Sequence, residues 1–427
     1  MILNDGEITF FIPMSEPLRS NRRRFLKKAG VSVVMLSGLS ASVSATQQSE
    51  GPDPNSYPDI LDAMDGDGSE ENPFTITTLE ELQAVDGALD GFFELDGDLD
   101  ASATAEWNGG EGFTPIGDGN TDGEAFTGVL DGRDYTITDL HINRTTDFIG
   151  LFSDVLGTLK NIHLESVTVS GDSNVGGLSG RLEDGAIEES SITGTVAGDV
   201  QGRGNGSNVG GLLGTNVDGT VSRSSADAEV SGEGRYVGGL VGYNRGKIAE
   251  SFADGDIYGT ERIQIQDLGG LVGHTRREVV DCYATATVHR HTEQAGGLVG
   301  LNTGEVRTSY AIGEAAAGLI GNNTGTSPEV SDSYWDVDAS GTTHSDQGEA
   351  LETSEMQGSE AETNLEGFDF ESTWQTTDGY PQLAWEASTS SSDNGGLSTN
   401  QWLGLFAAIG GGLYFWSKQN KQGDAGE

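Results

Sequence analysis

The 427-residue chain has few of the residues that supply cross-links and positive charge. It contains one cysteine, Cys282, which excludes an internal disulfide framework. After the first 45 residues the remaining lysines are Lys160, Lys247, Lys418 and Lys421. Because 22 Lys+Arg stand against 68 Asp+Glu, the net charge is −46 and no basic patch can neutralise phosphates. We therefore exclude nucleic acid as a partner.

Motifs for several enzyme classes are also absent. The sequence has no HExxH, GxSxG, P-loop or paired CxxC, which leaves zinc peptidases, α/β-hydrolases, nucleotide-binding enzymes and structural zinc sites without their residues. The His289-Arg290-His291 segment is better explained as a solvated loop than as a metal site. We expect no catalytic residue, no metal and no cofactor.

Two acidic stretches have oxygen ligands that calcium could use. They are Asp65-Gly66-Asp67-Gly68 and Asp96-Gly97-Asp98, and neither completes the ligand series of an EF-hand. Acidic turns are the favoured interpretation of both stretches.

The acidic composition itself favours a particular solvent. Carboxylates keep a protein soluble in brine, where salt screens their mutual repulsion. With 65 glycines, the sequence predicts a folded, turn-rich protein with halophilic adaptation.

The first 45 residues have the pattern of an export signal. Paired arginines precede a mild apolar run that ends in small residues, and the segment resembles a twin-arginine signal peptide. The residues that match the motif are Arg22, Arg23, Phe25, Leu26 and Lys27. Cleavage is expected after Ala45, and both Met1 and Met14 remain candidate start sites.

Near the other end, residues 401–417 include an uncharged stretch from Trp402 to Trp416, followed by Lys418 and Lys421. Tryptophans at both ends and lysines beyond them are typical of a membrane span with a cytoplasmic flank. Fifteen residues span about 22 Å as a helix, which is short for a bilayer core of about 30 Å. A buried terminal helix is the alternative, but the Ser/Thr/Gly linker at 387–400 favours a membrane anchor, with 418–427 as a cytoplasmic tail.

A Gly-Gly-Leu phrase recurs through the middle of the chain. Its central leucines lie at 151, 178, 212, 240, 271, 298 and 319, with steps of 27, 34, 28, 31, 27 and 21 residues. Repeats of this length indicate a solenoid or an array. Asn-Gly turn signals follow several copies.

The segment after each turn alternates small and polar residues, which is typical of a strand with one buried face. The small residues align between copies, with Ser190, Ser224, Ser251, Cys282 and Ser309 in one inward column. Cys282 is therefore expected to be a buried filler. Three short strands per repeat predict an all-β fold, a right-handed parallel β-helix with caps at both ends and a C-terminal membrane anchor helix.

These phrases resemble the GLUG motif of bacterial and archaeal surface proteins, including those of halophilic archaea. The copies GGLSG at Gly176, GGLLG at Gly210 and GGLVG at Gly238, Gly269 and Gly296 carry the resemblance, which covers residues 73 to 385. It implies export, a repetitive β architecture and frequent association with adhesins, with no shared active site.

Caps are expected because open solenoid ends invite aggregation. Thr77 and Glu80 form a candidate capping box for a helix bearing Leu79, Leu82 and Val85. The predicted divisions are a signal at 1–45, an acidic linker at 46–72, an N-terminal cap at 73–147, the solenoid at 148–345 and a C-terminal cap at 346–386.

One outward column acquires aromatic rings on consecutive repeats. Ser191 and Ser225 come first, and they are followed by Phe252, Tyr283, Tyr310 and Tyr334. Such a stripe could stack on sugar rings, but an aromatic ladder that stiffens the sheet is the favoured reading. Asn143, Asn205 and Asn322 begin N-x-S/T sequons and are glycosylation candidates.

Together these features favour an exported, membrane-anchored cell-surface protein that binds glycans or a surface-layer protein without catalysis. The alternative is a polysaccharide lyase or glycoside hydrolase, since parallel β-helices host both. It is weakened by the absence of any local grouping of Asp with Lys, Arg or His.

Overall fold

The structure is a computed structural model that divides the chain into two units, Met1–Gln47 and Gln48–Glu427. It describes residues 50–117, 125–198, 208–259, 266–289, 294–325 and 328–389. The predicted signal motif, the anchor at 401–417 and the cytoplasmic tail lie outside these ranges, as does nearly all of the linker. No helix within the ranges is long and apolar enough to cross a bilayer.

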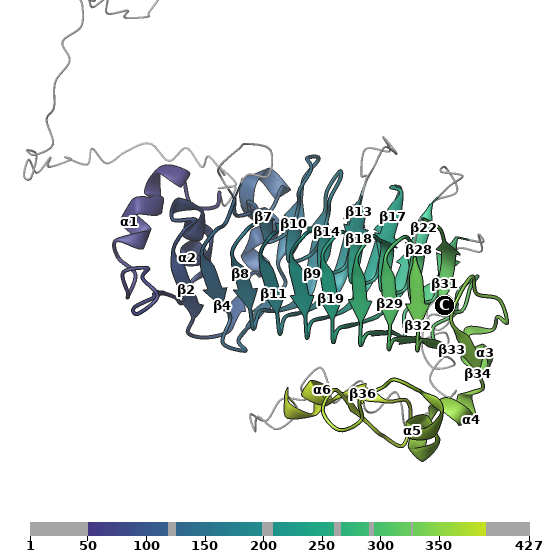
Figure 1. Ribbon diagram of the computed structural model, residues 1–427. Coiled ribbons are helices and arrows are strands. Elements are labelled where there is room, and N and C mark those ends of the chain that lie inside the picture. The colour runs from purple at the N-terminus through teal and green to yellow at the C-terminus, as the bar shows by residue number, and fades with distance from the viewer. Residues whose placement is uncertain are drawn as a thin grey trace, which may run out of the picture. The chain divides into compact units, whose positions relative to one another are not determined.

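Short parallel strands stack in register along the second unit (Figure 1). The first long sheet contains ten described strands: β1 (Phe74–Ile76), β2 (Phe92–Leu95), β4 (Val129–Asp131), β8 (Thr158–Lys160), β11 (Ala186–Glu188), β15 (Thr220–Ser222), β19 (Lys247–Ala249), β24 (Glu278–Val280), β29 (Glu305–Arg307) and β32 (Glu329–Ser331). In the strands between the two ends of this sheet the central side chains, such as Val221, Ile248 and Val279, are fully buried.

A second long sheet follows the first in each rung. It contains β3 (Leu99–Asp100), β5 (Thr136–Thr138), β6 (His141–Asn143), β9 (His163–Ser170), β12 (Ser191–Gly198), β16 (Ser225–Gly232), β20 (Phe252–Asp254), β21 (Asp256–Tyr258), β25 (Tyr283–Ala284), β26 (Thr287–Val288), β30 (Tyr310–Ala311), β33 (Tyr334–Asp336) and β34 (Glu349–Leu351). We call this the flank sheet.

The Gly-Gly-Leu phrases join two further sheets. One contains β13 (Asn208–Gly210), β17 (Tyr236–Gly238), β22 (Asp267–Gly269) and β27 (Ala295–Gly296). The other contains β7 (Phe152–Val155), β10 (Ser179–Glu183), β14 (Leu213–Val217), β18 (Val241–Asn244), β23 (Val272–Thr275), β28 (Val299–Asn302) and β31 (Ile320–Asn323). The central rungs therefore have strands in four sheets where the sequence predicted three, and the predicted parallel solenoid is confirmed.

Glycine recurs in the phrase because neighbouring backbones approach closely there. A Cβ on Gly239 would lie 2.1 Å from the carbonyl oxygen of Gly270 in the next rung. A Cβ on Gly211 would lie 2.3 Å from the oxygen of Gly239. Each phrase thus needs glycine at this position to let the rungs stack.

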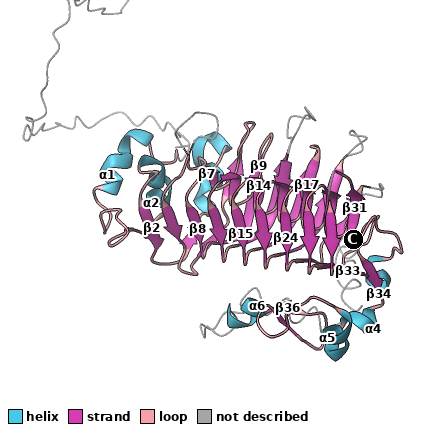
Figure 2. Ribbon diagram, viewed as in Figure 1, coloured by secondary structure: helices cyan, strands magenta, loops and turns pink. Residues whose placement is uncertain are grey.

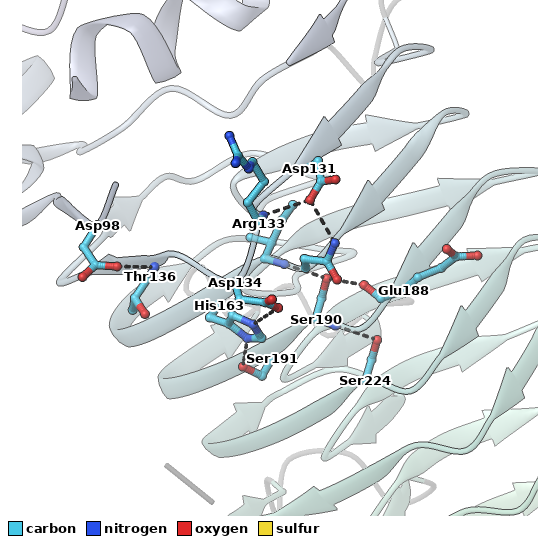
Figure 3. A network of polar contacts seen from close by, with 12 residues as sticks. Asp98, Asp131, Arg133, Asp134, Thr136, His163, Glu188, Ser190, Ser191 and Ser224 are labelled. Carbon is cyan, nitrogen blue, oxygen red and sulfur yellow. Dashed lines mark hydrogen bonds and ion pairs between the residues drawn. The ribbon is translucent and has the colours of Figure 1, made fainter. Parts of the chain in front are cut away.

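The inward serine column closes a corner as well as filling space (Figure 3). Ser190 Oγ donates to Glu188 O at 2.8 Å and accepts a hydrogen bond from Ile162 N at 3.2 Å. Ser190 N in turn donates to Ser224 Oγ at 3.2 Å. Residues just before this column, including Glu189 and Arg223, have positive φ without being glycine. The serine ladder supports these corners, which lie apart from the Asn-Gly turns that the sequence predicted.

The N-terminal region departs from the predicted boundaries. Residues expected to form an acidic linker instead fold as η1 (Pro54–Ser56) and α1 (Tyr57–Leu61), and they bury Tyr57, Leu61 and Met64. The apolar side chains at i, i+4 and i+7 of this segment pack on α2 (Leu79–Ala84) and η2 (Val85–Gly87). The burial of these side chains outweighs the acidic composition of the segment.

The cap and the solenoid also share one sheet. β1 and β2 pair in parallel and continue through β4 into β8, so no structural break occurs at residue 147. The capping box of α2 is formed by Thr78 and Glu81, one residue later than predicted, because the helix begins at Leu79. The helix η3 (Ser102–Gly110) completes this region.

The C-terminal region closes the end of the solenoid and then runs along its side. α3 (Val337–Ser340) and β34 follow the last rung, and Ser345 Oγ accepts from Ile320 N at 2.9 Å. Next come α4 (Thr353–Met356), η4 (Gly358–Glu360), α5 (Ala361–Asn364), the antiparallel pair β35 (Trp374–Gln375) and β36 (Gln382–Leu383), and α6 (Ala384–Thr389). We call residues 352–389 the arm. Described helices occur only before β4 and after β33 (Figure 2).

Candidate functional site

The predicted aromatic column is present on the flank sheet. Phe252, Tyr283, Tyr310 and Tyr334 occupy equivalent positions in β20, β25, β30 and β33. The ring centroids of Phe252 and Tyr283 lie 4.8 Å apart and those of Tyr283 and Tyr310 lie 5.2 Å apart, with nearly parallel planes. These distances follow from the spacing of neighbouring parallel strands.

The arm covers this column. Phe252, Tyr283, Tyr310 and Tyr334 are each at most 5% exposed, and they share a cluster with Met356, Ala361, Leu365, Phe368, Trp374 and Leu383. The expectation that the rings face solvent is therefore corrected: a later segment packs on them. The geometry matches the ladder reading.

Each tyrosine of the column also has a polar partner in the arm. Tyr283 Oη donates to Glu386 Oε2 at 3.0 Å, and Tyr310 Oη donates to Pro381 O at 2.6 Å. Tyr334 Oη donates to Glu366 O at 3.3 Å. Because a buried hydroxyl without a partner is costly, these bonds fix the register of the arm on the sheet.

Burial changes the acidity of groups at the contact between the arm and the sheet. It raises the pKa of the Tyr283 and Tyr310 hydroxyls well above the ordinary value. Burial also raises the pKa of Glu386 to about 7, against the hydrogen bonds from Leu383 N and Tyr283 Oη, which lower it. Burial therefore favours the protonated form of the Glu386 carboxyl.

Further toward the N-terminus the same sheet column carries half-buried polar side chains. His163 Nδ1 lies 2.8 Å from Ser191 Oγ, and His163 Nε2 lies 3.5 Å from Asp134 Oδ1 (Figure 3). A serine, a histidine and an aspartate therefore lie in a row on the open flank.

This row lacks two features of a hydrolytic triad. The Asp134 side chain is 80% exposed, so solvent competes for its contact with the ring. The Ser191 backbone N–H, a natural oxyanion donor, already donates to Ile162 O at 2.9 Å in the sheet ladder. The arrangement is explained by cross-strand polar pairing.

A different group of side chains lies around one Gly-Gly-Leu phrase. We define the ring cluster as Arg235, Tyr236, Tyr243, His274 and Arg276. The Tyr236 and Tyr243 rings are stacked with centroids 5.4 Å apart, and both centroids lie within 5.2 Å of the His274 ring. The tyrosines are half-buried and the two arginines are exposed.

The arginines lie on these rings. The guanidinium carbon of Arg235 lies 5.1 Å from the Tyr236 ring centroid, within cation–π range. Arg276 Nη1 donates to Tyr243 Oη at 3.3 Å. Arg235 Nε also lies 3.7 Å from Oδ2 of the buried Asp267.

The cluster perturbs its buried titratable groups. Burial lowers the pKa of His274 to about 4, and the charges of Arg276 and Arg235 act in the same direction. Burial raises the pKa of Asp267 to about 6, opposed by Arg235. The His274 ring is therefore neutral at pH 7.

The sequence reasoning missed this cluster although a signal was present. Tyr236 and Tyr243 lie four residues before and three residues after the central leucine of YVGGLVGY. Asp267 and His274 occupy the same two positions in DLGGLVGH. The same two positions are Asn208 and Thr215 one rung earlier, and Gln294 and Leu301 one rung later. The core positions of the phrase repeat from rung to rung, whereas these two positions change, and such change is expected where a repeat scaffold carries a specific contact.

Parts of the chain are similar in sequence to two known proteins. No family model matches the sequence, so the GLUG resemblance stays a prediction. The chain is similar to halomucin of Haloquadratum walsbyi, with 42% identity over 142 residues, or 31% of this chain and 2% of halomucin. It is also similar to a "Putative Gly-rich membrane protein" of Evansella cellulosilytica, with 37% identity over 135 residues, or 30% of this chain and 15% of that protein.

Among solved structures the chain is similar to a "putative immunoglobulin A1 protease" from Bacteroides ovatus. The TM-score is 0.53 at 18% identity, covering 75% of this chain and 94% of that one. At this identity the likeness concerns the fold alone.

Other predicted residues have clear surroundings. Cys282 is fully buried, and burial raises the pKa of its thiol, as expected of a filler. His289 stacks on Tyr258 with centroids 4.5 Å apart; Arg290 and His291 lie outside the described residues. Asn143 is exposed and Asn322 is half-buried, while Asn205 is also outside the described ranges.

The two candidate calcium stretches form turns. Asp67 Oδ1 accepts from Ser69 N at 3.1 Å, and Asp98 Oδ1 accepts from Thr136 N at 2.9 Å. Within the ranges that the structure describes, no group of three or more His, Cys, Asp or Glu side chains is placed to hold a metal ion.

Proposed function

We propose that this chain is an exported, membrane-anchored cell-surface protein whose solenoid is a non-catalytic binding scaffold for glycans or a surface-layer protein. The observation that carries the proposal is the contrast within each rung, where a constant interior supports side chains that change at the ring-cluster positions. Relatedness to halomucin and to a protein named as a membrane protein supports the surface location.

Export can be tested separately from binding. Replacing Arg22 and Arg23 by Lys should leave precursor in the cytoplasm, since the twin-arginine pair is the expected recognition element. Protease treatment of intact cells in molar salt would measure the surface fraction. Normal surface levels in the double variant would contradict this route.

Binding can be tested by comparing attachment of cells that have and lack the chain to glycan-coated and bare surfaces. The purified chain should retain polysaccharide without shortening it, as size-exclusion chromatography of the polysaccharide would report. Shortened products would move the proposal to the enzymatic alternative.

One observation favours that alternative enough to state its test. Asp227 in β16 and Asp254 in β20 are register neighbours, and a pair of carboxyl groups is what most glycoside hydrolases use. Partial burial, then the charges of Asp254 and Asp256, raises the pKa of Asp227. If products form, Asp227→Asn should abolish them, while Asp227 in a purely structural role would leave the product yield unchanged.

A further inference from the structure

The ring cluster places positive charge on a surface where the protein has little of it. The chain carries a net charge of −46, and most described arginines lie within 4.0 Å of a carboxylate oxygen. Arg276 differs, because its one side-chain hydrogen bond within the described residues goes to the Tyr243 hydroxyl. Its remaining guanidinium donors are exposed and available to an anion.

Two buried acceptor atoms lie at the cluster, one in His274 and one in the neighbouring Asp267. Thr303 Oγ1 donates to Thr275 O at 3.1 Å, so we assign the His274 proton to Nε2, which lies 3.0 Å from that hydroxyl oxygen. His274 Nδ1 is then an acceptor without a hydrogen-bond partner among the described residues, and Asp267 Oδ2 has the 3.7 Å ion pair with Arg235 Nε as its contact there. His274 is 7% exposed and Asp267 is 1% exposed. Such groups are costly, so stability alone does not explain this arrangement.

Stacked aromatic rings, an arginine without a carboxylate and an unsatisfied acceptor fit one class of ligand. An acidic sugar has an apolar ring face, hydroxyl donors and a carboxylate or sulfate group. A guanidinium binds such oxyanions in a planar, two-pronged manner.

We propose that the ring cluster binds acidic sugar units of a polysaccharide, with Arg276 at the anionic group and the tyrosine rings against the sugar. This rests on the proposed glycan-binding function and specifies its ligand. Uronates and sulfated sugars share the required chemistry.

High salt makes this recognition compatible with the acidic surface. At about 1 M salt the Debye length is about 3 Å, so repulsion between an acidic polymer and the rest of the protein is screened beyond contact distance. Contacts at the ring cluster then decide the affinity. The assay therefore belongs in molar salt.

The test is a binding titration of the full chain with alginate, dextran sulfate and neutral dextran. We expect at least about tenfold tighter binding to one or both acidic polymers than to dextran. Arg276→Gln should reduce this binding by about tenfold, the loss expected for a charged hydrogen bond, and should leave dextran binding unchanged. A response to alginate alone identifies a carboxylate ligand, and a response to dextran sulfate alone identifies a sulfate ligand.

Two variants serve as matched controls. Arg307→Gln removes the same charge from β29 on another sheet, and Tyr258→Ser removes an exposed ring that stacks on His289. Both should bind as the unchanged chain does, whereas Tyr243→Ser should weaken binding. Circular dichroism in the same salt checks the fold, and Arg276→Gln keeps the test valid if the tyrosine variant does not fold.

Several results would overturn the inference. Equal losses in Arg276→Gln and Arg307→Gln would show a general charge effect. The acidic ligand would be contradicted if Arg276→Gln bound the acidic polymers as tightly as the original chain, and the original chain bound dextran equally well. Glycan binding as the function would then remain in place. If the original chain bound none of the three polymers, both the inference and glycan binding as the function would be contradicted.

Discussion

Two parts of the flank sheet use the same column position in different ways. On the rungs of β9, β12 and β16 the position holds His163, Ser191 and Ser225, and each is half-buried. From β20 onward it holds Phe252 and then the tyrosines, all buried under the arm. The contrast teaches that an outward position in a repeat is not necessarily a solvent position, because a segment distant in sequence can cover it.

The interior does not account for this contrast. Ser190 and Ser224 behind the bare rungs make the same corner bonds as Ser309 behind a covered rung, with Oγ-to-carbonyl distances of 2.8 Å in all three. The difference therefore depends on the arm, and each buried ring contributes through the apolar area that it removes from water, about 150–250 Å². The following predictions test that dependence.

Removing salt should have the largest effect and should act on the arm first. The arm carries nine Asp and Glu residues and no Lys, Arg or His, and it packs on a sheet that is itself acidic. When dilution to about 0.1 M extends the Debye length to about 10 Å, repulsion should release the arm and then unfold the rungs. Hydrogen exchange of arm and rung amides during dialysis measures the order. Simultaneous exposure, or an unchanged circular dichroism spectrum in dilute buffer, would contradict this account.

Replacing Tyr283 and Tyr310 by Ser should detach the arm. Truncating a buried aromatic side chain costs about 3–5 kcal/mol, so the double variant should lose protection throughout residues 352–389 and melt at a lower temperature. Hydrogen exchange and thermal melting in molar salt test this. Full protection with an unchanged melting temperature would contradict the role of the column as the packing surface for the arm.

The arm should bind less firmly as the pH rises. The folded-state pKa of Glu386, about 7, lies above the ordinary value of 4.5, so the folded state holds more protons between these values. The stabilisation that protonated Glu386 gives to the folded arm is fully present below about pH 4.5 and is lost as the pH rises through 7. Its size is about 1.4 kcal/mol per unit of pKa difference.

Arm protection measured across this range should fall in the unchanged chain and stay nearly constant in Glu386→Gln. Tyr283 donates to this carboxyl directly. A variant with the same pH profile as the unchanged chain would assign the effect to another group.

The smallest effect is expected on the bare rungs. Ser225→Tyr adds an aromatic ring at a half-buried position outside the apolar cluster that the arm forms with the column, so the melting temperature should change little, by the equivalent of about 0.5 kcal/mol or less. Stabilisation comparable to the loss in Tyr310→Ser would mean that ring stacking along the sheet, without the arm, accounts for the ladder.

The sequence predicted the repeated part of the fold well because stacking imposes the same local constraint in every copy. Gly239 and the inward serines could be placed from spacing alone, and Cys282 could be recognised as a substitute for serine. The helix at 57–61 was hidden by its acidic neighbours, although Tyr57, Leu61 and Met64 have helical spacing.

The coverage of the aromatic column could not be predicted from the repeat. It depends on contacts such as Tyr310 to Pro381, between residues 71 positions apart, and no periodic pattern reports them. The ring cluster was overlooked for the opposite reason. Its residues break the repeat, and a search for what recurs discards what varies.

Hydroxyl-radical footprinting of the tyrosines by mass spectrometry, in molar salt, tests the central claim most directly. Tyr258 is 37% exposed and Tyr243 is half-buried, whereas Tyr283 and Tyr310 are 5% and 1% exposed. We expect strong labelling of Tyr258, intermediate labelling of Tyr243 and almost none of Tyr283 and Tyr310. Labelling of Tyr283 and Tyr310 as strong as that of Tyr258 would show that the column is open to solvent and contradict its role as the packing surface for the arm.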